Sequence, residues 1–88
     1  MKAFDELTPV YALKTIEVPW SLAAGASTGF SFSAPSVPGY GYITPTLAYS
    51  GVGGVAVDSC HWTMLNLHNR NSTPKSGTAK VQLLYLRP

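Results

Sequence analysis

Apolar and polar residues alternate in two runs near the end of the chain, over residues 62–69 and 78–86. The positions that share one parity are Leu65, Leu67 and Asn69 in the first run and Val81, Leu83 and Tyr85 in the second. A period of two residues is typical of half-buried β-strands. Residues 70–77, between the runs, are rich in turn-forming Asn, Ser, Thr, Pro and Gly. The pattern predicts a β-hairpin that closes a small all-β domain.

Shorter patterns upstream predict further strands. Residues 10–20 form one that is bounded by proline, and Phe30 and Phe32 alternate with serines in a second. Residues 40–49 form a third, in which Pro45 indicates an edge strand or a bulge.

A glycine-rich turn at residues 51–54 precedes the next strand, which starts at residue 55. That strand either continues to Asn69 or bends near Ser59. Residues 1–9 have no sustained period and are expected to be an N-terminal arm. Residues 10–88 are expected to be a single domain, an antiparallel β-sandwich of about six strands.

The last predicted strand is apolar on both parities. Its final residues are Leu83, Leu84, Tyr85 and Leu86. A strand of this kind should be covered on both of its faces. In a thin sandwich the second cover has to come from another subunit, so these four residues form the predicted subunit interface.

The composition excludes some classes of function. In a chain of 88 residues the core is thin, and the charged share of 11% is about half the usual value. A surface so poor in charge often has partners. The net charge of +2 is scattered, which argues against nucleic-acid binding. Cys60 is the only cysteine, so an intrachain disulfide is impossible, and stability must come from packing or oligomerisation.

Targeting signals are not apparent. Two acidic residues stand where a signal peptide would be apolar, and no run reaches the roughly 20 apolar residues of a membrane span. We expect a protein that is made in the cytoplasm and does not insert into a membrane.

One segment, Asp58-Ser-Cys-His61, brings together residue types used in catalysis. Consecutive residues of a strand point to opposite faces, so Cys60 and His61 would not share the hydrogen bond that activates a thiolate. His68 shares the parity of Cys60 but lies eight residues away, about 26 Å along a straight strand. We therefore expect no catalytic residues, with a small enzyme that uses Asp58, Cys60 and His61 as a rival interpretation.

Metal and cofactor sites are not expected either. The His, Cys and Asp residues lack the short paired spacings of zinc sites. The segment 51–54 has neither the lysine nor the following helix of a phosphate-binding loop, so it is interpreted as a turn.

A ligand site, if there is one, is predicted at Tyr49, Trp62, His68 and Arg70. Aromatic rings of this kind stack on sugars or fill interfaces, and the polar groups would bond hydroxyls. In a thin sandwich a Trp is more often packed in the core or between subunits, and that interpretation is favoured for Trp62.

The closing pattern also resembles a known family. Leu65-Asn-Leu-His-Asn69, a Ser/Thr-rich loop and Gly77-Thr-Ala-Lys-Val-Gln-Leu-Leu-Tyr-Leu86 resemble the end of small β-sandwich domains in phage tail-fibre and minor structural proteins. Those domains are related in architecture to H-type lectins. Upstream, Phe30-Ser-Phe-Ser-Ala-Pro35 looks like the family's early strand and turn, so the resemblance covers about residues 27–87.

The resemblance implies a homotrimer in a virion, with other virion proteins and cell-surface carbohydrate as partners. It suggests a phage or prophage module of the tail-fibre, receptor-binding type without enzymatic activity. The first rival is a purely structural virion protein, such as a decoration, fibre-anchoring or tail-tip component. A small host-directed regulatory protein is a further rival, and the family's sugar-contact residues have no motif in this chain.

Overall fold

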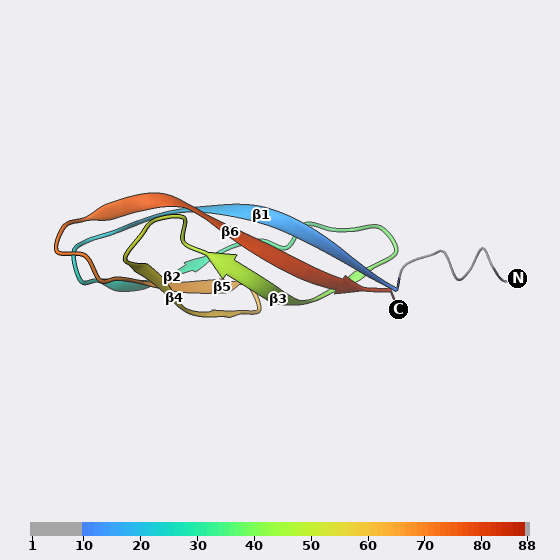
Figure 1. The fold of residues 1–88 in the computed structure, drawn as a ribbon. Helices are drawn as coiled ribbons and strands as arrows, with labels where there is room; N and C mark the ends of the chain where they lie inside the picture. Colours follow the sequence, from blue (N-terminus) through green and yellow to red (C-terminus); the bar gives the residue numbers. More distant parts are fainter. Residues whose placement is uncertain (1–9, 88) are drawn as a thin grey trace, which may run out of the picture.

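Alternating residues build an all-β structure in the computed structural model, which describes residues 10–87. The strands are β1 (Tyr11–Leu22), β2 (Ser27–Ser31), β3 (Gly41–Tyr49), β4 (Val55–His61), β5 (Met64–Asn69) and β6 (Lys75–Leu86). They form two antiparallel three-stranded sheets, in the orders β1-β6-β3 and β2-β5-β4 (Figure 1). No helix occurs in residues 10–87. The predicted all-β class is confirmed, while the predicted arm at residues 1–9 lies outside the described residues.

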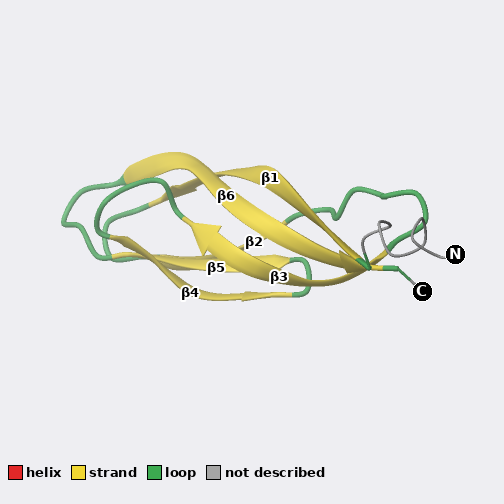
Figure 2. Cartoon of the chain, turned by 45° about the vertical axis from the view of Figure 1, so that its right-hand side comes forward, coloured by secondary structure: helices red, strands yellow, loops and turns green. Residues whose placement is uncertain are grey.

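The predicted closing hairpin is wrong, because its two strands belong to different sheets. β5 lies between β2 and β4, whereas β6 lies between β1 and β3 (Figure 2). The chain crosses from one sheet to the other over residues 70–74. A polar loop of five residues serves either connection, so turn-forming residues alone did not distinguish a hairpin from a crossing.

Asn69 holds this crossing in place. Its side chain is fully buried, and Nδ2 donates hydrogen bonds to the carbonyl oxygens of Ala23 and Thr73 at 3.1 and 3.0 Å. Its Oδ1 accepts hydrogen bonds from the backbone N and the side-chain Nδ2 of Asn71 at 2.9 and 3.0 Å. Asn69 thus joins the end of β5 to the β1–β2 connection and to the crossing loop.

The core lies between the two sheets and contains residues from both. Its buried apolar members are Val18, Trp20, Leu22, Val55, Leu65, Leu67, Ala79, Val81, Leu83 and Tyr85. The parity predicted for the last two strands is confirmed by this set. Trp20 is accommodated because its Nε1 donates a hydrogen bond to the carbonyl oxygen of Ser50 at 2.9 Å.

Two of the four residues predicted for the subunit interface are buried inside the chain. Leu83 and Tyr85 are 0% and 1% exposed within the chain, so they are core residues and have no surface left for a neighbour. Leu84 is half-buried and Leu86 is exposed. Because side chains alternate across a strand, only Leu84 and Leu86 point to the outer face of the β1-β6-β3 sheet.

The strands of the β1-β6-β3 sheet extend beyond the other sheet, since β1 and β6 have 12 residues each and β5 has six. The connection between β2 and β3 covers this end of the inner face. The Tyr85 hydroxyl donates a hydrogen bond to the carbonyl oxygen of Pro35 at 2.6 Å, and Val37 packs against the core.

Irregular positions lie at the edges of the sheets. β3 is an edge strand, as Pro45 predicted, and its pairing with β6 shifts register between Tyr42 and Thr44 and again after Pro45. β4 shifts register between Val57 and Ser59. A tight turn at residues 62–63 divides the run from residue 55 to 69 into two strands, β4 and β5.

Candidate functional site

Trp62 occupies the tight turn between β4 and β5 and is 55% exposed. The sequence favoured a Trp62 that is packed in the core or between subunits, and its exposure excludes the first of these two placements. Its φ is +55°, the one positive value among non-glycine residues of the described chain. Two-residue hairpin turns need such a value, and glycine or asparagine usually supplies it. A bulky aromatic residue at this position carries a conformational cost that a smaller residue would avoid.

Tyr42 contacts both the ring and the backbone of Trp62. The two ring centroids are 5.0 Å apart at an interplanar angle of 37°, and the Tyr42 hydroxyl donates a hydrogen bond to the carbonyl oxygen of Trp62. Tyr42 in turn contacts Tyr85, with centroids 5.4 Å apart. A ladder of three aromatic rings thus leads from the core to the surface.

The hydroxyl of Tyr42 is held in its protonated form. Burial raises the pKa of Tyr42 above its ordinary value, and the neighbouring Cys60 and Tyr85 add to the effect because a second negative charge beside them is unfavourable. Tyr42 therefore remains a hydrogen-bond donor to the Trp62 turn at neutral pH.

The other predicted ligand residues lie on separate surfaces. Tyr49 is exposed at the end of β3, where it pairs in register with Lys80 on the β1-β6-β3 sheet. His68 is on β5 in the other sheet, and its Nδ1 is hydrogen-bonded to Ser27 Oγ at 2.5 Å. Trp62 and Arg70 lie beyond opposite ends of β5, whose six residues span about 20 Å. One protomer does not bring Tyr49, Trp62, His68 and Arg70 into a single site.

Ser27 was missed by the sequence reasoning. It faces His68 because β2 pairs with β5, at the register position Ser27 to His68. Asn66 on the same face donates a hydrogen bond from Nδ2 to Ser59 Oγ at 2.9 Å. No local pattern marks Ser27, since its partner lies 41 residues away.

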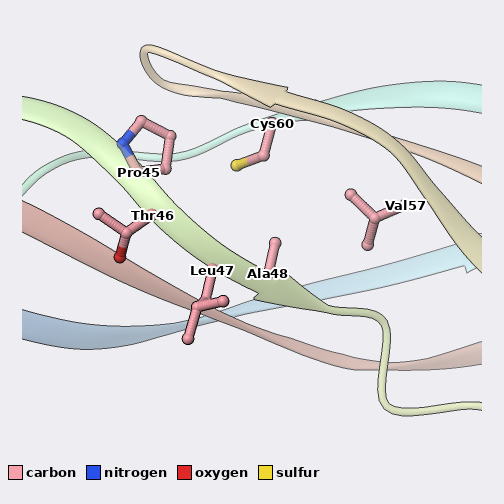
Figure 3. Close-up of a pocket in the computed structure, with 6 residues that line it drawn as sticks. All are labelled: Pro45, Thr46, Leu47, Ala48, Val57 and Cys60. Carbon is pink, nitrogen blue, oxygen red and sulfur yellow. The ribbon is translucent and has the colours of Figure 1, made fainter.

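A pocket of about 240 Å³ lies between the edge strands β3 and β4 (Figure 3). It is lined by Pro45, Thr46, Leu47, Ala48, Val57 and Cys60. The thiol of Cys60 points from β4 toward β3. It is the one ionisable group in this lining, and burial raises its pKa, which disfavours the reactive thiolate.

The segment Asp58-Ser-Cys-His61 does not converge on one point. Cys60 pairs with Leu65 on the inner face, and His61 pairs with Met64 on the outer face. Asp58 is exposed at the register shift of β4. Within residues 10–87, no cluster of three or more His, Cys, Asp or Glu side chains is arranged to hold a metal ion.

Comparison with known proteins finds no match: no family model fits the sequence, and no curated protein or solved structure is similar to it. The described residues include no helix long and apolar enough to cross a membrane.

Proposed function

We propose that this chain is a non-enzymatic binding module of a phage or prophage virion, of the tail-fibre, receptor-binding type. Its two sheets form a β-sandwich, and it acts as a homotrimer together with other virion proteins. The ligand class is host-surface carbohydrate, and no cofactor takes part. The sequence resemblance supplies the virion context.

The exposed Trp62 ring is the observation that carries the binding role. Its position in the turn is conformationally costly, and it rests on Tyr42 rather than in the core. Costly backbone conformations cluster at ligand-binding positions. An exposed aromatic ring with a rigid support offers a flat apolar surface, which suits the apolar face of a sugar ring.

The same geometry supports binding over catalysis. The raised pKa of Cys60 works against nucleophilic attack, and His61 lies on the opposite face of β4. The Ser27 and His68 pair is exposed on a sheet surface. Catalysis by such a pair requires a third group to orient the base, and Ala56, the other register neighbour of His68, cannot act in that way.

A glycan array tests the proposal. The wild-type protein is expected to bind a subset of glycans, Trp62→Ala is expected to lose the signal, and Trp62→Phe is expected to keep part of it because a smaller ring still stacks. Far-UV circular dichroism of each variant checks that the fold is intact. A silent array would remove the carbohydrate role. Equal signals for wild type and Trp62→Ala would remove Trp62 from the site.

A purely structural virion role is the second candidate. It is favoured by the exposed apolar residues on the outer face of the β1-β6-β3 sheet, among them Leu13, Leu47 and Leu86. Exposed apolar surfaces of this kind mark sites of contact with another protein. Neighbouring genes separate the two roles, since an adjacent capsid gene favours decoration and a fibre operon with a positive array favours receptor binding.

A further inference from the structure

One half of the outer face of the β1-β6-β3 sheet is apolar. Its residues, here called the apolar half-face, are Tyr11, Leu13, Leu47, Leu84 and Leu86. They are contiguous, because Tyr11 pairs with Leu86 and Leu13 with Leu84 across β1 and β6. Leu47 pairs with Gln82 on the other side of β6, one step along the same face.

The exposure of the apolar half-face is unusual for a protein that works alone. Leu13 is 48% exposed, Leu47 is 50% exposed and Leu86 is 42% exposed. They lie next to Tyr11, which is 51% exposed, and to the half-buried Leu84. Single apolar side chains scattered over a surface are normal, whereas adjacent ones mark sites of contact with another protein.

Three of the four edge strands, β1, β3 and β4, are poorly suited to a strand-like partner, and the fourth, β2, has only five residues. β1 contains Pro19 and carries Lys14 on its inward parity, and β3 contains Pro45 and two register shifts. β4 is interrupted at Asp58. Prolines, bulges and inward charges are devices that prevent strand addition. Contact through the face is therefore favoured over contact through an edge.

Charge favours a second copy as the occupant. No residue of the apolar half-face is charged, and the nearest charges on this face, Glu17 and Lys80, pair with each other across β1 and β6. Copies of this face that meet around a threefold axis therefore bring no net charge together. An apolar, neutral surface suits contact among copies of the chain, because like charges are not brought together.

We infer that copies of this chain associate through the apolar half-face, so that the outer face of the β1-β6-β3 sheet is the subunit interface. Leu84 and Leu86 act there with Leu13, Leu47 and Tyr11, whereas Leu83 and Tyr85 support the interface from inside the protomer. The inference adds the location of the contact to the proposed function. It does not depend on the ligand, because association and glycan binding are separate measurements.

Light scattering on the purified protein tests the contact. Wild type is expected to have the mass of three chains. The double variant Leu13→Ser and Leu86→Ser is expected to dissociate to one chain, with association at least tenfold weaker. Both side chains are about half exposed in the protomer, so the substitutions should leave the fold intact, which circular dichroism checks.

Met64→Ser is the matched control. The exposed fraction of Met64, 41%, is nearly the same as that of Leu86, 42%, but Met64 lies on the outer face of the β2-β5-β4 sheet. Its substitution is expected to leave the mass at three chains. A wild-type mass of one chain at millimolar concentration would overturn the inference, as would a double variant that keeps the wild-type mass. A positive glycan array in either case would leave the binding role in place.

Discussion

The outer faces of the two sheets differ in chemistry although their inner faces share one core. On the β2-β5-β4 sheet the outer side chains other than Met64 are small or polar, and two pairs of them are hydrogen-bonded, Ser27 with His68 and Asn66 with Ser59. On the β1-β6-β3 sheet Leu13 and Leu84 stand opposite each other beside the pair of Tyr11 and Leu86, and the polar register neighbour of Leu84 is Thr44 on β3. A face whose polar groups are satisfied by their neighbours is suited to water, whereas the apolar half-face is suited to a protein partner.

The largest expected effects come from the inner faces. Leu67→Ala on β5 and Leu83→Ala on β6 should each lower the free energy of unfolding by about 2–5 kcal/mol, since both side chains are fully buried. The adjacent Leu84→Ala, which is half-buried, should cost only about 1 kcal/mol in the dissociated protomer. Urea titration at low protein concentration measures all three. Equal costs for Leu83 and Leu84 would contradict the assignment of inner and outer faces.

The crossing between the sheets depends on Asn69. Asn69→Ala should destabilise the fold by about 2–3 kcal/mol, because the partly buried carbonyl oxygens of Ala23 and Thr73 and the N–H of Asn71 lose their partner. Asn66→Ala is the matched control, and it should cost less than about 1 kcal/mol because its hydrogen bond to Ser59 is exposed. Thermal unfolding of both variants gives the comparison, and it fails if Asn66→Ala is as costly as Asn69→Ala.

The half-buried thiol of Cys60, between β3 and β4, predicts that the stability of the fold depends on pH. Because burial raises the pKa of Cys60 in the folded protein, the folded state holds the thiol proton more tightly than the unfolded chain. This contribution to stability is complete below the thiol pKa of the unfolded chain and is lost as pH rises through the higher pKa of the folded state. Cys60→Ala should flatten the alkaline limb of a stability–pH curve.

The same pKa shift predicts slow alkylation of Cys60. Iodoacetamide near neutral pH should modify the folded protein more slowly than the same protein in urea, because less thiolate is present and the thiol is half-buried. Faster alkylation in the folded state would revive the enzyme interpretation based on Asp58, Cys60 and His61.

The smallest expected effect is at Trp62. Trp62→Gly should change the free energy of unfolding by less than about 1 kcal/mol, because relief of the positive φ, about 1–2 kcal/mol, offsets the lost stacking on Tyr42, about 0.5–1.5 kcal/mol. Trp20→Ala, in the core, should cost about 3–5 kcal/mol. A large loss of stability in Trp62→Gly would mean that Trp62 serves packing rather than ligand binding.

Alternation in the sequence was sufficient to predict which residues are buried in the last two strands. The same period does not say which strands are neighbours, so β5 and β6 were paired incorrectly. Pro45 was informative because proline is restricted to edges and bulges. The edge position of the strand that contains Pro45 could therefore be predicted without knowing which strands are neighbours.

The candidate site was less predictable. Trp62 was expected in the core or between subunits, with ligand binding as the other interpretation, because a positive φ at a tryptophan has no sequence signal. Ser27 and His68 meet only through the pairing of β2 with β5. The apolar half-face was anticipated through Leu84 and Leu86, yet its other members come from β1 and β3, which sequence patterns did not place beside β6.

Hydroxyl-radical footprinting tests the difference between the two outer faces most directly. The measurement is the oxidation of each side chain in wild type, relative to the double variant Leu13→Ser and Leu86→Ser at the same concentration. Tyr11 and Leu47 should be oxidised less in wild type than in the variant, whereas Trp62 and Met64 should be oxidised equally in both. Equal oxidation of Tyr11 and Leu47 in the two proteins would contradict the assignment of the apolar half-face as the subunit interface.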